Sequence, residues 1–191
     1  MSQPTLTVAN QLTLLRIALV PALIALVLSH RFRWALVTFI LAGVTDLLDG
    51  LIARLGRQRT TLGAVLDPIA DKLLLGSSYV ALTWASSLPC SIPAWLTLTI
   101  LTRDVIIVIA VLVVNLFVGR RFFLPSFLGK VNTAVQLVTA GLVMVSNALG
   151  GCIRGVDTIF AITFGVTVVS GVHYVWTAGT QAAPQAPPPT D

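Results

Sequence analysis

Charged residues are scarce in this sequence, and one type is missing altogether. Asp, Lys and Arg together make up 10% of the 191 residues, and there is no Glu. A soluble domain averages about 25% charged residues. Because so few charges cannot cover a folded globule in water, the composition excludes most soluble enzymes and any disordered chain. It favours a protein that places apolar surface against lipid.

Cysteine is scarce as well. The two cysteines, Cys90 and Cys152, are too few for a disulfide framework. Both fall in predicted loops on one side of the membrane, where a single bridge is geometrically possible. We expect small buried or interfacial thiols instead. The N-terminus has no basic region before its apolar stretch and no small-residue cleavage site, so we expect mature protein and not a signal peptide.

Apolar runs are what the sequence has in excess: 56% of the residues are hydrophobic and the mean hydropathy is +0.93. Six stretches are each long enough to cross a hydrocarbon core of about 30 Å as a helix. They cover residues 8–28, 34–55, 67–87, 92–118, 128–149 and 156–177. We therefore predict an all-α, polytopic membrane protein with six transmembrane helices. The prediction gives one membrane domain, residues 1–177, followed by a disordered Pro-rich tail, residues 178–191.

The basic residues predict the orientation in the membrane. There are 12 Lys and Arg against seven acids, but no basic run or aromatic-interleaved patch, so we expect no nucleic-acid partner. Cytoplasmic loops rich in Lys and Arg explain the surplus. With the N-terminus in the cytoplasm, the inward-facing cations are Arg54, Arg57, Arg59, Arg120, Arg121 and Lys130, and the outward-facing ones are Arg31, Arg33 and Arg154. We expect a multi-pass protein of a bacterial cytoplasmic membrane, with both termini and a polar chamber facing the cytosol.

Four aspartates lie within or beside the second and third stretches. Asp46 and Asp49 are spaced i, i+3, and Asp67 and Asp71 are spaced i, i+4, so each pair projects from one face of its helix. An Asp near the middle of a membrane helix costs about 2.5–3.5 kcal/mol on insertion scales. If the two helices meet, the four carboxylates converge, and hard divalent cations such as Mg²⁺ are their natural counter-charge. The alternative is that they pair with Lys72 and the neighbouring arginines.

The aspartates belong to a longer pattern of eight specified residues. From Asp46 the sequence reads DLLDGLIARLGRQRTTLGAVLDPIAD, which is D-x2-D-G-x2-A-R-x8-G-x3-D-x3-D. This string resembles the signature of the CDP-alcohol phosphatidyltransferases, integral membrane enzymes of phospholipid synthesis. All of its fixed positions are matched, and the six-span plan agrees as well.

The resemblance implies a role for each matched residue. Asp46, Asp49, Asp67 and Asp71 would bind two divalent ions, Mg²⁺ or Mn²⁺, and Asp71 would also be the general base. The CDP-lipid would be contacted by Gly50, Ala53, Arg54, Thr60 and Gly63, which belong to or lie within the signature region, and by Asn10 and Thr13. We place Gly63 in the loop before Asp67.

The implied reaction transfers a phosphatidyl group from CDP-diacylglycerol to an acceptor hydroxyl, with release of CMP. The downstream segments 92–108 and 127–137 look most like the cardiolipin synthases of the family, whose acceptor is phosphatidylglycerol. The alternative is a phosphatidylglycerophosphate synthase, whose acceptor is glycerol 3-phosphate. That group often carries an Arg where this chain has Val111. The resemblance also implies a homodimer.

The acceptor site is expected at a second group of charges, Arg103, Lys130 and Arg120. Arg103 and Asp104 are sequence neighbours on a helix, so we expect them not to face each other. A different class, a membrane cation transporter, would also place carboxylates on paired helices. The polar residues lie toward one side of the membrane only, which favours the enzyme.

Overall fold

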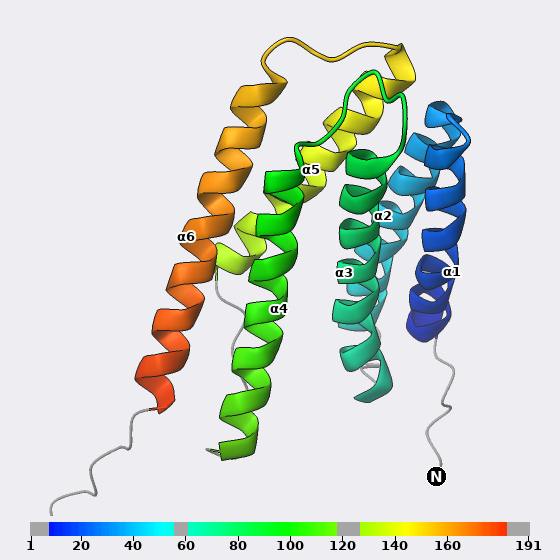
Figure 1. The fold of residues 1–191 in the computed structure, drawn as a ribbon. Coiled ribbons are helices and arrows are strands. Elements are labelled where there is room, and N and C mark those ends of the chain that lie inside the picture. Colours follow the sequence, from blue (N-terminus) through cyan, green and yellow to red (C-terminus); the bar gives the residue numbers. More distant parts are fainter. Residues whose placement is uncertain (1–7, 56–60, 118–126, 183–191) are drawn as a thin grey trace, which may run out of the picture.

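The computed structural model describes residues 8–55, 61–117 and 127–182, and this part of the chain is all-helical, as predicted. Figure 1 shows its six helices running up and down the bundle. They are α1 (Val8–Leu28), α2 (Phe32–Leu55), α3 (Thr61–Trp84), α4 (Ala94–Phe117), α5 (Phe127–Leu149) and α6 (Val156–Ala182).

The helices form two groups of three. Helix α1 packs against both α2 and α3, and α6 packs against both α4 and α5. Contacts of α3 with α4 and α5, and of α2 with α5, join the groups. In Figure 1, α1 begins and α6 ends at the same end of the bundle, which we call the terminal end. The turns before α2, α4 and α6 lie at the opposite end, which we call the turn end.

The surface of the bundle is rich in apolar side chains, and polar side chains are buried beside its apolar core. Large apolar side chains such as Ile40, Val138 and Val172 are exposed, whereas Arg16 and Asn132 are fully buried. Such extensive apolar exposure marks a surface that meets lipid or a partner. Within the described ranges, α5 and the segment Val156–Thr177 of α6 are long and apolar enough to cross a membrane, and shorter apolar stretches occupy Thr13–Leu28 and Phe32–Thr45.

The four tryptophans lie near the ends of helices. Trp34, Trp84 and Trp95 lie at the turn end, and Trp176 lies toward the terminal end. All four are exposed. Tryptophan concentrates at the two membrane–water interfaces, where its ring is at headgroup level and its N–H can reach a polar partner. Their placement fits a bundle that spans the bilayer.

Two helix boundaries differ from expectation. Helix α3 begins at Thr61, so Gly63 lies inside its first turn and not in a loop. The first backbone N–H groups of a helix have no intrahelical partner, and one glycine costs only about 1 kcal/mol, so Gly63 does not prevent this earlier start. Helix α6 continues to Ala182, five residues into the expected tail. Residues 183–191 lie outside the described part.

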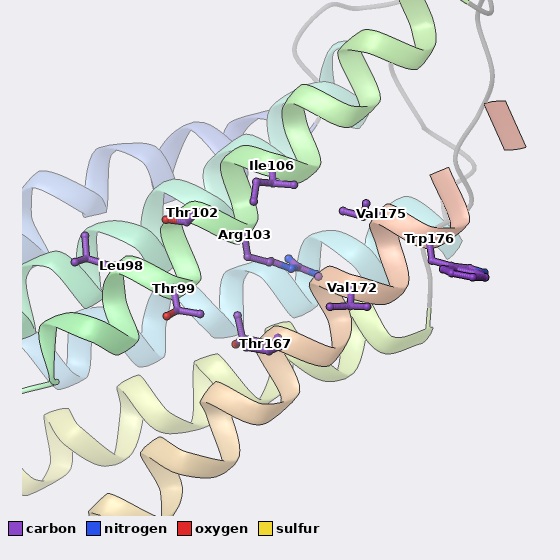
Figure 2. A pocket seen from close by; sticks show the side chains of 11 residues that line it. Leu98, Thr99, Thr102, Arg103, Ile106, Thr167, Val172, Val175 and Trp176 are labelled. Atoms are coloured by element: carbon purple, nitrogen blue, oxygen red, sulfur yellow. The ribbon is translucent and has the colours of Figure 1, made fainter. Parts of the chain in front are cut away.

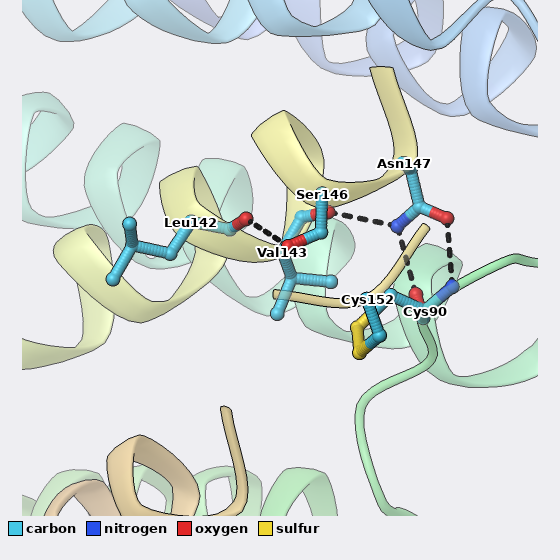
Figure 3. Close-up of a disulfide and its surroundings, with 6 residues drawn as sticks. All are labelled: Cys90, Leu142, Val143, Ser146, Asn147 and Cys152. Carbon is cyan, nitrogen blue, oxygen red and sulfur yellow. Dashed lines mark hydrogen bonds between the residues drawn. A yellow bond between two sulfur atoms is a disulfide. The ribbon is translucent and has the colours of Figure 1, made fainter. Parts of the chain in front are cut away.

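The turn end is fastened by a disulfide that we did not expect. Cys90 and Cys152 are joined, not separate thiols, and each precedes its helix, α4 or α6, by four residues (Figure 3). Asn147 of α5 holds the same loop, because its side-chain nitrogen donates to the Cys90 carbonyl at 2.7 Å and its oxygen accepts from the Cys90 N–H at 3.1 Å. Gly150 then ends α5 with a φ of 79°, the left-handed conformation that favours glycine at this position.

Removal of this bridge should lower thermal stability. A cross-link between residues 62 positions apart contributes at most about 4 kcal/mol by the chain-entropy estimate. We expect the Tm of Cys90→Ser/Cys152→Ser, measured in detergent without reductant, to fall by about 5–15 °C. Reductant should lower the Tm of the wild type but not that of the variant. Ser91→Ala, an exposed change in the same loop, is the control, and an unchanged Tm in the double variant would contradict the structure.

Candidate active site

The aspartate signature extends from the second half of α2 to the first half of α3. Asp49 lies six residues before the end of α2, and Asp67 lies six residues after the start of α3, which is about 9 Å in each case. Asp46 and Asp71 lie about 14 Å and 15 Å from the same ends. Counted along the helices, the two pairs therefore lie at similar distances from the α2–α3 connection, and their convergence stays a prediction.

Only part of the expected site can be followed at the level of side chains. The structure does not describe the side chains of residues 46–68, so it leaves untested the orientation of Asp46, Asp49, Gly50, Ala53, Arg54, Gly63 and Asp67. Asn10 lies on α1, and its side chain is likewise outside the described part. Thr60 and Arg120 lie wholly outside it.

Asp71 is the signature carboxylate whose surroundings are described. Arg16 of α1 is completely buried, and its Nη1 donates to Asp71 Oδ1 at 2.6 Å. The Asp71 side chain is 39% exposed. Thr13, one turn before Arg16, is also fully buried. The ion pair therefore joins α1 to α3 and holds the carboxylate at the edge of the protein interior.

A small polar cavity adjoins Asp71. It has a volume of about 170 Å³ and lies between α3, α4 and α5. At about 30 Å³ for each molecule of liquid water, this is room for about five waters or a small polar headgroup. Its lining residues are Asp71, Lys72, Leu75, Asp104, Thr133 and Gln136. A carboxylate at the wall of such a cavity can accept a proton from a hydroxyl bound inside it.

Three charged side chains beside the cavity form one cluster. Lys72 of α3 contacts Asp104 Oδ1 at 2.6 Å, and Arg103 Nη1 contacts the same oxygen at 2.9 Å. The expectation that Arg103 and Asp104 do not face each other is therefore wrong, because the long arginine side chain folds back to its neighbour. Arg103 Nη2 also donates to Ser170 of α6 at 2.7 Å. The cluster, which we call the Lys72–Asp104–Arg103 cluster, links α3, α4 and α6.

Two of the three residues that we expected to bind the acceptor, Arg103 and Lys130, lie in the described part of the chain. Arg103 takes part in the Lys72–Asp104–Arg103 cluster, with a side chain 11% exposed. Lys130 is exposed on the first turn of α5. Sequence reasoning gave Arg16 no role at the site. The signal was an arginine three residues after Thr13, on the same face of an otherwise apolar helix.

The donor set suits a divalent cation. Carboxylate oxygens are the ligands that Mg²⁺ and Mn²⁺ prefer, and the signature supplies four carboxylates on two helices. Among the side chains that the structure describes, no three His, Cys, Asp or Glu gather into a metal site. Three of the four aspartates lie outside that set, so the metal site remains a prediction.

The sequence also matches a known family and several named relatives. The model of the CDP-alcohol phosphatidyltransferase family matches residues 6–172. A cardiolipin synthase (CMP-forming) of Homo sapiens is 43% identical over 148 residues, which is 69% of this chain and 48% of the human protein. The chain thus spans about half the length of that relative.

Two bacterial relatives are covered more fully. A cardiolipin synthase (CMP-forming) of Streptomyces coelicolor is 37% identical over 185 residues, 89% of this chain and 81% of the relative. A probable phosphatidylglycerophosphate synthase of Mycobacterium tuberculosis is 39% identical over 177 residues, 87% of this chain and 79% of the relative. Because the chain is about equally identical to relatives with two different named activities, the identity of the acceptor has to be argued from the site.

The contact between Arg16 and Asp71 can be tested by a double-mutant cycle. Arg16→Met, Asp71→Asn and the double variant should give a coupling free energy of about 1–3 kcal/mol, because each single change leaves a partner without its counter-charge. The measurement is the free energy of unfolding in detergent. Arg16→Met combined with Asp157→Asn, an exposed carboxylate at the turn end, should be additive. Additivity in the first pair as well would show that the two side chains do not interact.

Proposed function

The chain belongs to the CDP-alcohol phosphatidyltransferase family, and from this premise we propose that it transfers a phosphatidyl group from CDP-diacylglycerol to an acceptor hydroxyl, releasing CMP. The observation that carries the proposal is the position of Asp71, the last residue of the signature, at the wall of the polar cavity. A phosphotransfer enzyme needs a base within reach of the attacking hydroxyl, and the cavity offers that hydroxyl a place.

The chemistry follows from the signature and the described contacts. The acceptor oxygen attacks the phosphorus attached to the lipid and forms a new P–O bond. The bond from that phosphorus to the bridging oxygen breaks, and CMP departs with the electron pair. Asp71 takes the proton of the attacking hydroxyl, while Arg16 keeps its carboxylate at the cavity wall. Arg54 would hold the diphosphate electrostatically.

The metal requirement is part of the proposal. Asp46, Asp49, Asp67 and Asp71 would hold divalent ions, Mg²⁺ or Mn²⁺ and two in number, which neutralise the diphosphate and the leaving phosphate. Ionised carboxylates without a counter-charge are costly in a membrane. Bound divalent cations would offset that cost and would at the same time bind the diphosphate of the substrate. The remaining contacts to the CDP-lipid would come from Gly50, Ala53, Thr60, Gly63, Asn10 and Thr13.

We further infer that six helices span the membrane. The terminal end would lie on the cytoplasmic side, and the polar chamber would open to the cytosol. The loop cations favour this orientation, and one observation at the turn end supports it. The Cys90–Cys152 disulfide lies in the loops of that end. Disulfides persist on the oxidising side of a bacterial cytoplasmic membrane and are rare in the cytosol.

We propose phosphatidylglycerol as the acceptor, which makes the product cardiolipin. Relatives of two organisms named cardiolipin synthase support this choice. Glycerol 3-phosphate is the second candidate, supported by the relative named a probable phosphatidylglycerophosphate synthase. A free phosphate monoester needs concentrated positive charge, and the chain has Val111 where that group often has Arg.

The role of Asp71 can be tested by one substitution. Asp71→Asn removes the base but keeps the size of the side chain, so turnover should fall by about 10²–10⁴-fold, while CDP-diacylglycerol still binds. The measurements are CMP release and equilibrium binding of the CDP-lipid in detergent. Asp157→Asn is the matched control and should retain turnover. Normal turnover of the Asp71 variant would remove it from the mechanism.

The acceptor can be identified from the lipid product. We expect purified protein with CDP-diacylglycerol and Mg²⁺ to make cardiolipin when phosphatidylglycerol is supplied, and to release no CMP with glycerol 3-phosphate. Chelation of the divalent ion should stop the reaction. Phosphatidylglycerophosphate as the product would reverse the choice of acceptor while leaving the family chemistry intact.

A further inference from the structure

A large apolar groove runs between α4 and α6 (Figure 2). Its volume is about 1000 Å³, at the upper end of the range for small-molecule sites. Most of its walls are aliphatic or aromatic, with Leu98 and Ile106 on α4 and Val172, Val175 and Trp176 on α6. Both the size and the apolar lining suit hydrocarbon chains better than a polar metabolite.

Arg103 lies in the middle of this groove. Figure 2 shows its side chain extending from α4 toward α6, between the apolar lining residues. A glycine faces it on α6: a Cβ added at Gly171 would lie 3.2 Å from Arg103 Cγ. The absence of a side chain at this position gives the arginine room to cross from one helix to the other.

Among the side chains that the structure describes, two cations share one carboxylate in the Lys72–Asp104–Arg103 cluster, which leaves one surplus positive charge beside the groove. A surplus charge inside the hydrocarbon region is costly and is best met by an anion. The cluster therefore favours an anionic ligand over a neutral one.

Two buried hydrogen-bond donors point in the same direction. Among the described residues, Arg103 Nε and Asn132 Nδ2 have no hydrogen-bond partner. Asn132 is adjacent to the groove through its oxygen, which accepts from Thr167 Oγ1 at 2.9 Å, and Thr167 lines the groove. Buried donors without partners are costly, and Arg103 lines the groove, where a phosphate oxygen is a strong acceptor for its guanidinium.

We propose that the groove binds the acyl chains of the acceptor phospholipid, with the acceptor's phosphodiester at Arg103 and its headgroup directed to the cavity beside Asp71. This inference rests on the proposed function. The aspartate signature is on α2 and α3, whereas the groove is on α4 and α6, so donor and acceptor lipids approach from different helices. Glycerol 3-phosphate would make no use of the apolar walls.

The depth of Arg103 is compatible with a lipid headgroup. Its partner Ser170 lies seven residues before Thr177, the end of the apolar segment of α6, which is about 10 Å along the helix. Trp176, at that end of the groove, is at interface level. A phospholipid drawn inward by this distance would bring its phosphate to Arg103 while its chains stay among apolar residues.

The groove can be blocked by one bulky side chain. Val172→Trp fills it, and Val169→Trp makes the same change on α6 at a similarly exposed residue outside the groove lining. With the full chain in mixed micelles, we expect Val172→Trp to raise the KM for phosphatidylglycerol at least about tenfold, as expected from steric overpacking. The KM for CDP-diacylglycerol should stay within about twofold for both variants, which also shows that they are folded.

Any other result would contradict the proposed acceptor groove, and each one points to a different explanation. A raised KM for CDP-diacylglycerol in Val172→Trp would assign the groove to the donor, and unchanged constants would leave it without a substrate. An altered oligomeric state with unchanged constants would make it an interface between copies of this chain. If the wild type uses glycerol 3-phosphate alone, the acceptor inference is wrong but the family chemistry stands. If it releases no CMP with either acceptor, the proposed function itself fails.

Discussion

Charge in a hydrocarbon environment has to be balanced, and this constraint organises the interior of the bundle. One Asp, Lys or Arg at the centre of a membrane helix costs about 2.5–3.5 kcal/mol on insertion scales. The described charges nearest the middle of the helices meet this cost through contact: Arg16 with Asp71, and Lys72 and Arg103 with Asp104. Two of these contacts cross between helices, so balancing the charge also fixes α1 against α3 and α3 against α4.

The two groups of charge differ in their balance, and this difference suits two substrates. Asp71 has a buried arginine as its counter-charge, whereas two cations share Asp104. On the proposed function, the signature carboxylates and their cations receive the diphosphate of the donor, and the surplus positive charge receives the phosphodiester of the acceptor. The polar cavity adjoins both groups, because its lining includes Asp71, Lys72 and Asp104. A hydroxyl there would lie between the base and the site of anion binding.

Local patterns allowed the helices and the signature to be predicted, whereas contacts between distant segments could not be. Helix length and apolar content depend on residues that are neighbours in the sequence, so both can be predicted locally. The predicted all-α class is confirmed, and several helix boundaries agree with the predicted ones within a few residues. The pairing of Arg16 with Asp71 depends on which helix α1 meets, which no local pattern specifies. The Cys90–Cys152 bridge likewise depends on two loops 62 positions apart. Arg103 reaches Asp104 because its long side chain can leave the direction that helical spacing predicts.

The disulfide and the proposed acceptor groove are mechanically related. Cys90 and Cys152 lie four residues before α4 and α6, so the bridge ties together the starts of the two helices that form the groove. With this end held, the width of the groove depends on the angle at which α6 leaves α4. Arg103 and Ser170 restrain that angle near its middle, where Gly171 permits close approach. A lipid entering near Trp176 would therefore meet a groove that is fixed at the far end and held by a polar contact in the middle.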